Sequence, residues 1–164
     1  MKRFDYRQTA VWVSLLLASA MTHAQEKGCI ELSTVAEIEQ HYQDEQGRPA
    51  TRLVPADKVV PGNEVVWTIT AKNVCDTPAE DIVIANAVPK HMSYVANSAM
   101  GVGTQVAFSL DGERFELADK LQVREAEGVA RLARADEYRA IRWRYTAPFP
   151  KDATAFVRYR ATVN

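Results

Sequence analysis

Apolar and polar residues alternate with a period of two over much of this chain. In the stretch 63–73, Val65, Trp67 and Ile69 fall on one side and Thr68 and Thr70 on the other. Such alternation predicts a β-strand with one buried face, and β-branched and aromatic residues fit a pleated surface. Alternation or short apolar runs predict further strands over 29–39, 51–54, 82–84, 93–98, 106–110, 113–117, 141–145 and 156–163.

Turn residues separate these predicted strands. Proline, glycine and acidic residues mark reversals at 61–62 and 75–79, and the polar stretch 41–50 is expected to be a loop. Asp111-Gly112 lies between two alternating runs and predicts a hairpin. The run 82–84 is apolar on both faces, which favours a strand that is covered on both sides or lies near the centre of a sheet. Residues 119–140 are less regular, and the alanine, leucine and arginine content of 129–140 predicts a short helix that crosses between sheets.

About eight short strands joined by such turns favour an all-β fold, an antiparallel β-sandwich, over a parallel sheet with interposed helices. The predicted inward residues near the C-terminus include Trp143, Tyr145, Val157 and Tyr159. The tryptophan and tyrosine rings at these positions supply much of the core area if their polar tips find partners.

The first 24 residues have the order of a secretory signal peptide. Three basic residues precede the apolar run 10–21, and Thr22-His23-Ala24 ends in a small residue. The run is too short to span a bilayer, which needs about 20 residues. The alternative to a cleaved signal peptide is an amphipathic anchor that the mature chain retains. We therefore expect a signal peptide over 1–24, a single β-sandwich domain over 25–164, and no membrane span in the mature chain.

Removing the leader takes away three basic residues and one acidic residue, so the formal net charge changes from −1 to −3. A weakly acidic, exported chain is a poor match to a nucleic-acid partner, which calls for a strong basic excess.

Export also affects the interpretation of Cys29 and Cys75, the only cysteines in the chain. An oxidising compartment favours a structural disulfide between them. Closing this 46-residue interval would stabilise the fold by roughly 4 kcal/mol. Two free buried thiols and a redox pair are the alternatives, although the chain has no Cys-x-x-Cys motif.

The stretch 61–98 resembles a known family. The matching residues are Pro61-Gly62, Val66 to Ile69, Asn73, Pro78-Ala79, Ile82 to Ile84, Val88-Pro89, Tyr94-Val95 and Ser98. In this pattern the chain resembles the conserved-repeat domain of bacterial envelope and surface proteins, catalogued as domain of unknown function eleven. The family-like core covers about residues 53–164.

The chain departs from that pattern at three places. Val74-Cys75 replaces the usual glycine after the asparagine, Asn86 replaces the usual aspartate, and the glycine expected before the last strand is absent from 150–152. The resemblance implies an immunoglobulin-like sandwich of about 7–9 strands and an envelope or extracellular setting. It carries no catalytic residue to this sequence.

Few residues point to metal or catalytic chemistry. His41 and His91 lie in separate predicted loops without ligand spacing, and His23 leaves with the signal peptide. Acidic residues 76, 80 and 81 flank a turn, but they lack the oxygen-ligand spacing of calcium loops. We expect no cofactor, no metal and no enzymatic activity.

Four arginines form the candidate binding surface. Arg142 and Arg144 alternate with Trp143, and Arg158 and Arg160 flank Tyr159. If 141–163 forms a hairpin, all four share one outer face, which could bind an anionic partner through bidentate contacts. Alternatively, they pair across the sheet with Glu31, Glu37 and Glu39.

These observations predict an exported, non-catalytic β-sandwich module with a structural or protein-interaction role in the bacterial cell envelope, periplasmic or secreted. Other envelope or surface proteins are its expected partners. The alternative is a small periplasmic or secreted protein that recognises an anionic polysaccharide or lipid headgroup. An exposed edge strand would favour the first function, and a pocket with convergent polar groups the second.

Overall fold

The computed structural model describes residues 28–126 and 128–164. The predicted signal peptide, and with it His23, lies outside these residues. The described chain is built from strands and one 3₁₀ turn. The strands are β1 (Ile30–Gln43), β2 (Pro49–Pro55), β3 (Glu64–Asn73), β4 (Val83–Ala87), β5 (Met92–Tyr94), β6 (Met100–Gly101), β7 (Thr104–Ser109), β8 (Gln122–Arg124), β9 (Ala130–Leu132), β10 (Ala140–Tyr145) and β11 (Thr154–Val163), and the 3₁₀ turn is η1 (Ala135–Glu137).

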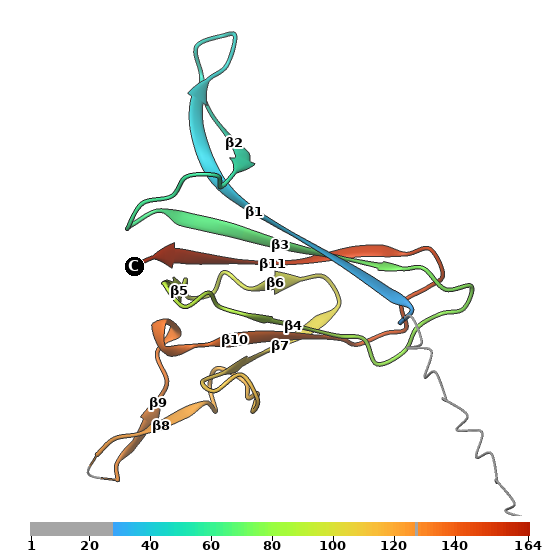
Figure 1. The fold of residues 1–164 in the computed structure, drawn as a ribbon, viewed down its shortest axis with the longest axis vertical. Helices are drawn as coiled ribbons and strands as arrows, with labels where there is room; N and C mark the ends of the chain where they lie inside the picture. The colour runs from blue at the N-terminus through green and yellow to red at the C-terminus, as the bar shows by residue number, and fades with distance from the viewer. Residues whose placement is uncertain (1–27, 127) are drawn as a thin grey trace, which may run out of the picture.

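Two antiparallel sheets face each other (Figure 1). The six-stranded sheet has the order β2-β1-β3-β11-β5, with β6 also paired to β11. The three-stranded sheet has the order β4-β10-β7, and β8 and β9 form a separate two-stranded ribbon. The prediction of an all-β antiparallel sandwich is confirmed.

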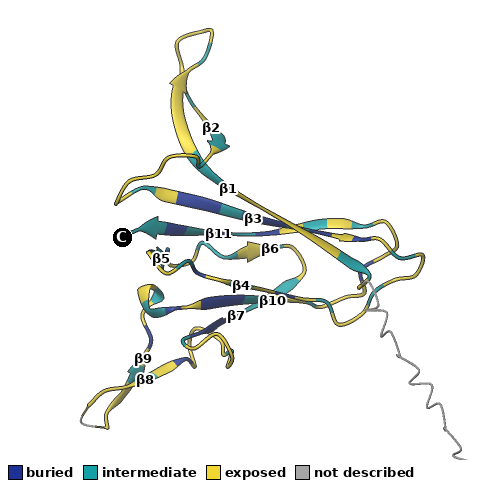
Figure 2. Cartoon of the chain, viewed as in Figure 1, coloured by how far each residue is buried: buried dark blue, intermediate teal, exposed yellow. Residues whose placement is uncertain are grey.

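The core lies between β3 and β11 on one side and β10 on the other, where Figure 2 shows the buried segments in dark blue. Trp143 and Tyr159 are its largest fully buried side chains, with ring centroids 6.1 Å apart. The alternation of 141–145 and 156–163 therefore predicted the inward residues correctly. The hydroxyl of Tyr159 accepts a hydrogen bond from Asn86 Nδ2 at 2.8 Å, and burial raises the pKa of Tyr159 to about 12.

The β1–β2 hairpin extends beyond the rest of the six-stranded sheet, at the top of Figure 1. The expected loop over 41–50 is correct only in its middle, because β1 continues to Gln43 and β2 begins at Pro49. Asp44 closes the turn by accepting the backbone N–H groups of Gln46 and Arg48, each at 2.9 Å. Gly47 has a φ of +75° there, which glycine adopts without strain.

The strand β1 is less buried than its alternation suggested. Leu32 lies opposite Ala71, a core residue, so both side chains lie on the inner face of the sheet. Leu32 is nevertheless 51% exposed. The three-stranded sheet is narrower than the six-stranded one, so β1 has little to pack against.

Three local predictions were wrong or incomplete. Within 119–140, where a short helix was predicted, the chain forms β8 and β9, and its helical part is the single 3₁₀ turn η1. The strand β4 lies at the edge of its sheet, not at its centre, and Val83 is partly exposed. Residues 113–117 form no strand; a single pair of backbone hydrogen bonds joins Glu116 to Phe108 beyond the Asp111-Gly112 turn.

Candidate interaction surfaces

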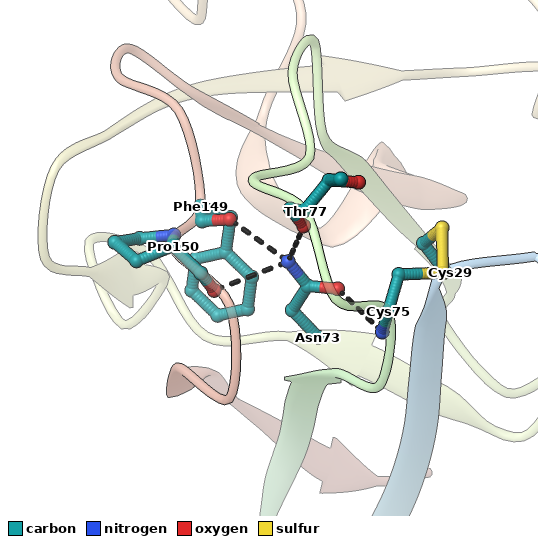
Figure 3. Close-up of a disulfide and its surroundings, with 6 residues drawn as sticks. All are labelled: Cys29, Asn73, Cys75, Thr77, Phe149 and Pro150. Carbon is teal, nitrogen blue, oxygen red and sulfur yellow. Dashed lines mark hydrogen bonds between the residues drawn. A yellow bond between two sulfur atoms is a disulfide. The ribbon is translucent and has the colours of Figure 1, made fainter.

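A buried asparagine organises one end of the sandwich (Figure 3). Asn73 is the last residue of β3 and is fully buried. Its Nδ2 group donates to the carbonyl oxygens of Thr77, Phe149 and Pro150 at 2.9, 3.0 and 3.1 Å. Its Oδ1 accepts the backbone N–H of Cys75 at 3.0 Å. One side chain therefore holds together the turn after β3 and the connection between β10 and β11.

The disulfide lies beside this asparagine. Cys29 and Cys75 are bonded, as predicted, and the bond joins the residue before β1 to the turn that follows β3. The backbone N–H of Val74 also donates to the carbonyl oxygen of Cys29 at 2.8 Å. Together with Asn73, the bond fixes the positions of 73–77 and of 149–150 (Figure 3).

An apolar cleft of about 420 Å³ lies next to this fixed end. Two of its lining side chains are strongly exposed, Val102 at 88% and Phe156 at 51%. The Tyr145 hydroxyl is buried without a hydrogen-bond partner among the described residues, and burial raises its pKa. The cleft is lined by Val102, Gly103, Tyr145, Ala147, Pro148, Phe149, Thr154, Ala155 and Phe156.

An unpaired stretch of strand borders the cleft. The pairing of β11 with β6 ends at Val157 opposite Gly101, while β11 begins at Thr154. The carbonyl oxygen of Ala153, just before β11, accepts a hydrogen bond from the backbone N–H of Asn73 in β3. The carbonyl oxygen of Arg160 accepts one from Val95, which follows β5 on the other side of β11. Backbone groups alternate in direction along a strand, so those of the even-numbered residues of β11 point away from β3. In this register Phe156 lies opposite Val102, and among the described residues no strand is paired with β11 before Val157 on that side.

Sequence reasoning did not identify this cleft. Two signals were present: Phe156 is an aromatic residue on the outward side of an alternating strand, and Val102 lies between two glycines. The cleft itself brings together three segments that are distant in sequence, and no local pattern predicts that.

The predicted arginine face is wrong in its geometry. β10 pairs with β4 and β7, whereas β11 pairs with β3, β5 and β6, so 141–163 forms no hairpin. The chain instead crosses from one sheet to the other between Tyr145 and Thr154. Arg142 and Arg144 therefore lie on the outer face of one sheet, and Arg158 and Arg160 on the outer face of the other.

The pair on β11 is largely occupied by neighbouring groups. Arg160 forms ion pairs with Glu39 and Glu64, and these contacts, that with Glu64 first, raise the pKa of its guanidinium. Arg158 Nε donates to Thr68 Oγ1 at 2.9 Å, and its guanidinium lies 5.6 Å from the centre of the Phe156 ring. The alternative of cross-strand pairing is correct for Arg160 with Glu39.

The pair on β10 has weaker partners. The guanidinium of Arg142 lies 4.7 Å from the centre of the Phe115 ring. None of the ion pairs among the described residues joins Arg142 to a carboxylate. Arg144 Nη1 lies 4.0 Å from Asp81 Oδ1, a contact between two exposed groups that contributes little. With Gln105, these two arginines line a shallow depression of about 180 Å³.

The remaining polar candidates do not converge. Within 28–126 and 128–164, no three histidine, cysteine or acidic side chains lie close enough to hold a metal ion. His41 contacts Thr51 across the β1–β2 hairpin, and Asp76 pairs with Lys151. In the same part of the chain, no helix has the length and apolar character needed to cross a bilayer.

Comparison with models of protein families, with curated proteins and with solved structures found no match to this chain. The resemblance to the conserved-repeat domain rests on the residues quoted above.

Proposed function

We propose that this protein is an exported, non-catalytic β-sandwich module with a structural or protein-interaction role in the bacterial cell envelope. The leader-like sequence of residues 1–24 supports export. The Cys29–Cys75 disulfide fits an oxidising compartment such as the periplasm or the extracellular space. The resemblance to envelope-protein repeats supports the same setting.

The apolar cleft is the observation that carries the interaction role. Exposed apolar surface that gathers at one place is typical of binding sites. Here Val102 and Phe156 flank a cleft, and the hydrogen bond from Asn73 to the carbonyl oxygen of Phe149 holds one of its walls. On the side of β11 that faces away from β3, no strand among the described residues pairs with β11 before Val157, and an extended segment can add to the sheet there. The partner is therefore an extended apolar segment of another envelope protein.

Photo-crosslinking in a bacterial host tests this function. A photoreactive phenylalanine analogue is placed at Val102, and the matched control places it at Leu132, which is exposed on β9 at a distance from the cleft. We expect a discrete cross-linked product from position 102 in the exported fraction, and a mature chain that begins at Gln25. Equal labelling at both positions, or a chain retained in the cytoplasm, would contradict the proposal.

A second candidate function is recognition of an anionic polysaccharide or lipid headgroup. The observation that favours it is the pair Arg142 and Arg144. Arg160 forms close ion pairs with two glutamates, whereas the ion pair of this set is the 4.0 Å contact of Arg144 with Asp81. Arginine recognises sulfate and phosphate groups through two parallel hydrogen bonds. The depression beside Gln105 gives such a group a place to bind.

The two arginine pairs supply matched variants for this second candidate. Binding to a heparin-like polymer and to lipopolysaccharide is measured for Arg142→Ala/Arg144→Ala and for Arg158→Ala/Arg160→Ala. We expect the first double variant to lose most of the binding and the second to retain it. If neither double variant changes the affinity, the anionic-ligand function is excluded.

A further inference from the structure

A second cavity lies at the side of the sandwich away from β1. In the strand orders, β5 is at the end of the larger sheet opposite to β2 and β1, and β7 is at one end of the smaller sheet. Residues of β5, β7 and η1, together with residues of the adjoining loops, line a cavity of about 300 Å³ there. This cavity shares no lining residue with the cleft at Val102.

Three aromatic rings pack against one another in the lining of this cavity. The ring centroids of Phe108 and Tyr138 are 4.5 Å apart, and that of Tyr94 lies 5.2 and 5.7 Å from them. All three residues are buried, so the cavity is formed against the core itself. Aromatic rings attract further rings in offset or edge-to-face arrangements at similar separations.

The other lining residues are mostly small. Four of them are alanines, at positions 96, 99, 118 and 135, so no long side chain occupies the space beside the rings. Small-molecule sites usually have volumes of about 300–1,000 Å³, and this cavity lies at the lower end of that range. A single ring with a short substituent is therefore the size of ligand that it fits.

Hydrogen bonds hold two walls of the cavity in place. On one side, the backbone N–H of Ala99 donates to the hydroxyl of Tyr94 at 2.9 Å. On the other, the carboxylate of Glu137 accepts two bonds from Arg131 and one from the backbone N–H of Arg134, each at 2.7 Å, which closes the η1 turn. A preformed site binds a ligand without the cost of ordering its loops.

The polar side chains in the lining carry no charge. They are the hydroxyls of Tyr94 and Tyr138 and the amide of Asn97. Burial, then the neighbouring Tyr94 and Glu137, raise the pKa of Tyr138, so its hydroxyl stays protonated and can donate a hydrogen bond. A charged ligand would lose its hydration in this cavity without gaining a counter-charge, which is unfavourable.

From this cavity we propose that the protein binds a neutral aromatic ring with one hydrogen-bonding substituent, a phenol, against Tyr94, Phe108 and Tyr138. The rings supply the apolar contact, the alanines supply the space, and the hydroxyls and the amide recognise the substituent. A free phenolic compound and a tyrosine side chain of another protein present the same chemistry.

A titration followed by NMR tests this site, with p-cresol as the probe. We expect saturable binding, with shift changes confined to amides of 96–99, 106–108, 118 and 135–138. Cyclohexanol has a hydroxyl but no aromatic ring, and it should bind roughly two- to tenfold more weakly. Benzoate should bind about tenfold more weakly or worse, because its charge loses hydration.

Two variants that fill the cavity from different walls give the matched test. Ala96 and Ala118 are exposed lining residues, so leucine at either position can occupy the cavity without disturbing the core. We expect Ala96→Leu and Ala118→Leu each to weaken p-cresol binding about tenfold or more, because the added side chain takes the place of the ring. Ala85→Leu is the control, since Ala85 is exposed on β4 and outside the cavity.

Three results would overturn the proposal: no saturable binding of p-cresol, equal affinity for cyclohexanol, or an affinity that neither filling variant changes.

A short peptide distinguishes the two sources of the ring. Acetyl-Gly-Tyr-Gly-amide is titrated in the same way, with the leucine analogue of the peptide as its control. A peptide that binds at these amides at least as tightly as p-cresol assigns the ring to a tyrosine of a partner protein. Weaker binding of the peptide assigns it to a free compound.

The cavity and the cleft at Val102 are separate surfaces, so either proposal can fail without the other.

Discussion

At the residue scale, Asn73 contributes more than its size suggests. Its amide satisfies three carbonyl groups and one N–H that come from two separate connections. Buried backbone groups left without a partner cost about 1–3 kcal/mol. The family resemblance marked this asparagine, but only the structure reveals that its partners include Phe149 and Pro150.

We expect Asn73→Ala to lower the free energy of unfolding by roughly 2–4 kcal/mol, since it removes four hydrogen bonds and buried, packed atoms. The carbonyl oxygens of Phe149 and Pro150 keep their bonds from Ala79 and Ala153. Urea denaturation monitored by tryptophan fluorescence provides the measurement. Thr77→Ala is the control, because Thr77 contributes only its backbone carbonyl oxygen to Asn73. A loss below about 0.5 kcal/mol, the usual range for surface changes, would show that Asn73 is dispensable.

The Asp111 carboxylate gives a pH-dependent contribution at the same scale. It accepts the backbone N–H groups of Arg114 and Glu113 and the hydroxyl of Ser109, and these bonds lower its pKa from 3.8 to about 2. Since the pKa is lower in the folded state, the stabilisation is complete above the unfolded value of 3.8. It disappears as the pH falls from there through about 2.

Asp111→Asn should therefore flatten the pH dependence of stability between about pH 4 and pH 2. Urea midpoints at half-unit pH intervals for the wild type and the variant provide the comparison. Parallel curves across this interval would mean that the turn does not depend on the charge of Asp111.

At the element scale, the β1–β2 hairpin depends on its own turn. A two-stranded ribbon is marginally stable in water by itself, and here its outer part pairs with no third strand among the described residues. Gly47 has a positive φ with no heavy atom near its position for a Cβ, so a substitution there acts through backbone strain alone. For alanine this strain is about 1–2 kcal/mol.

We expect Gly47→Ala to accelerate amide exchange of Ala50 and Arg52 by roughly five- to thirty-fold, which corresponds to that strain. Amides of β3 and β11 should be unchanged, because the sheet core does not depend on the turn. Glu45→Ala, at an exposed position of the same turn, is the control. Faster exchange throughout the sheet would indicate that the hairpin and the core unfold together.

The sequence predicted elements better than it predicted their pairing. Alternation located β3, β10 and β11 because their inward residues are large and apolar. It did not reveal that β10 and β11 belong to different sheets, since strands adjacent in sequence pair in only about two-thirds of cases. The helix predicted within 119–140 from residue propensity was wrong, because this stretch forms β8 and β9. Tertiary context often overrides helix propensity. The predicted arginine face failed with the pairing, because its two pairs lie on different sheets. The sequence also did not show that Glu64 pairs with Arg160, since the two residues meet only in the folded sheet.

At the scale of the whole molecule, the disulfide links stability to the compartment. It joins the start of β1 to the turn after β3 across 46 residues, and β1 contributes few residues to the core. The strand β1 is therefore held mainly by its ladder with β3 and by this covalent bond. Closing a loop of that length restricts the unfolded chain and stabilises the fold by roughly 4 kcal/mol.

Cys29→Ala/Cys75→Ala should accordingly unfold at a lower urea concentration, with a loss of roughly 4 kcal/mol. The reducing agent is the internal control: it should lower the wild-type midpoint toward that of the double variant and leave the double variant unchanged. A wild-type midpoint that is the same with and without reductant would contradict a stabilising role. With that role, a chain held in a reducing compartment loses an amount of free energy comparable to the total stability of many small domains, so the stability of the fold depends on oxidising surroundings.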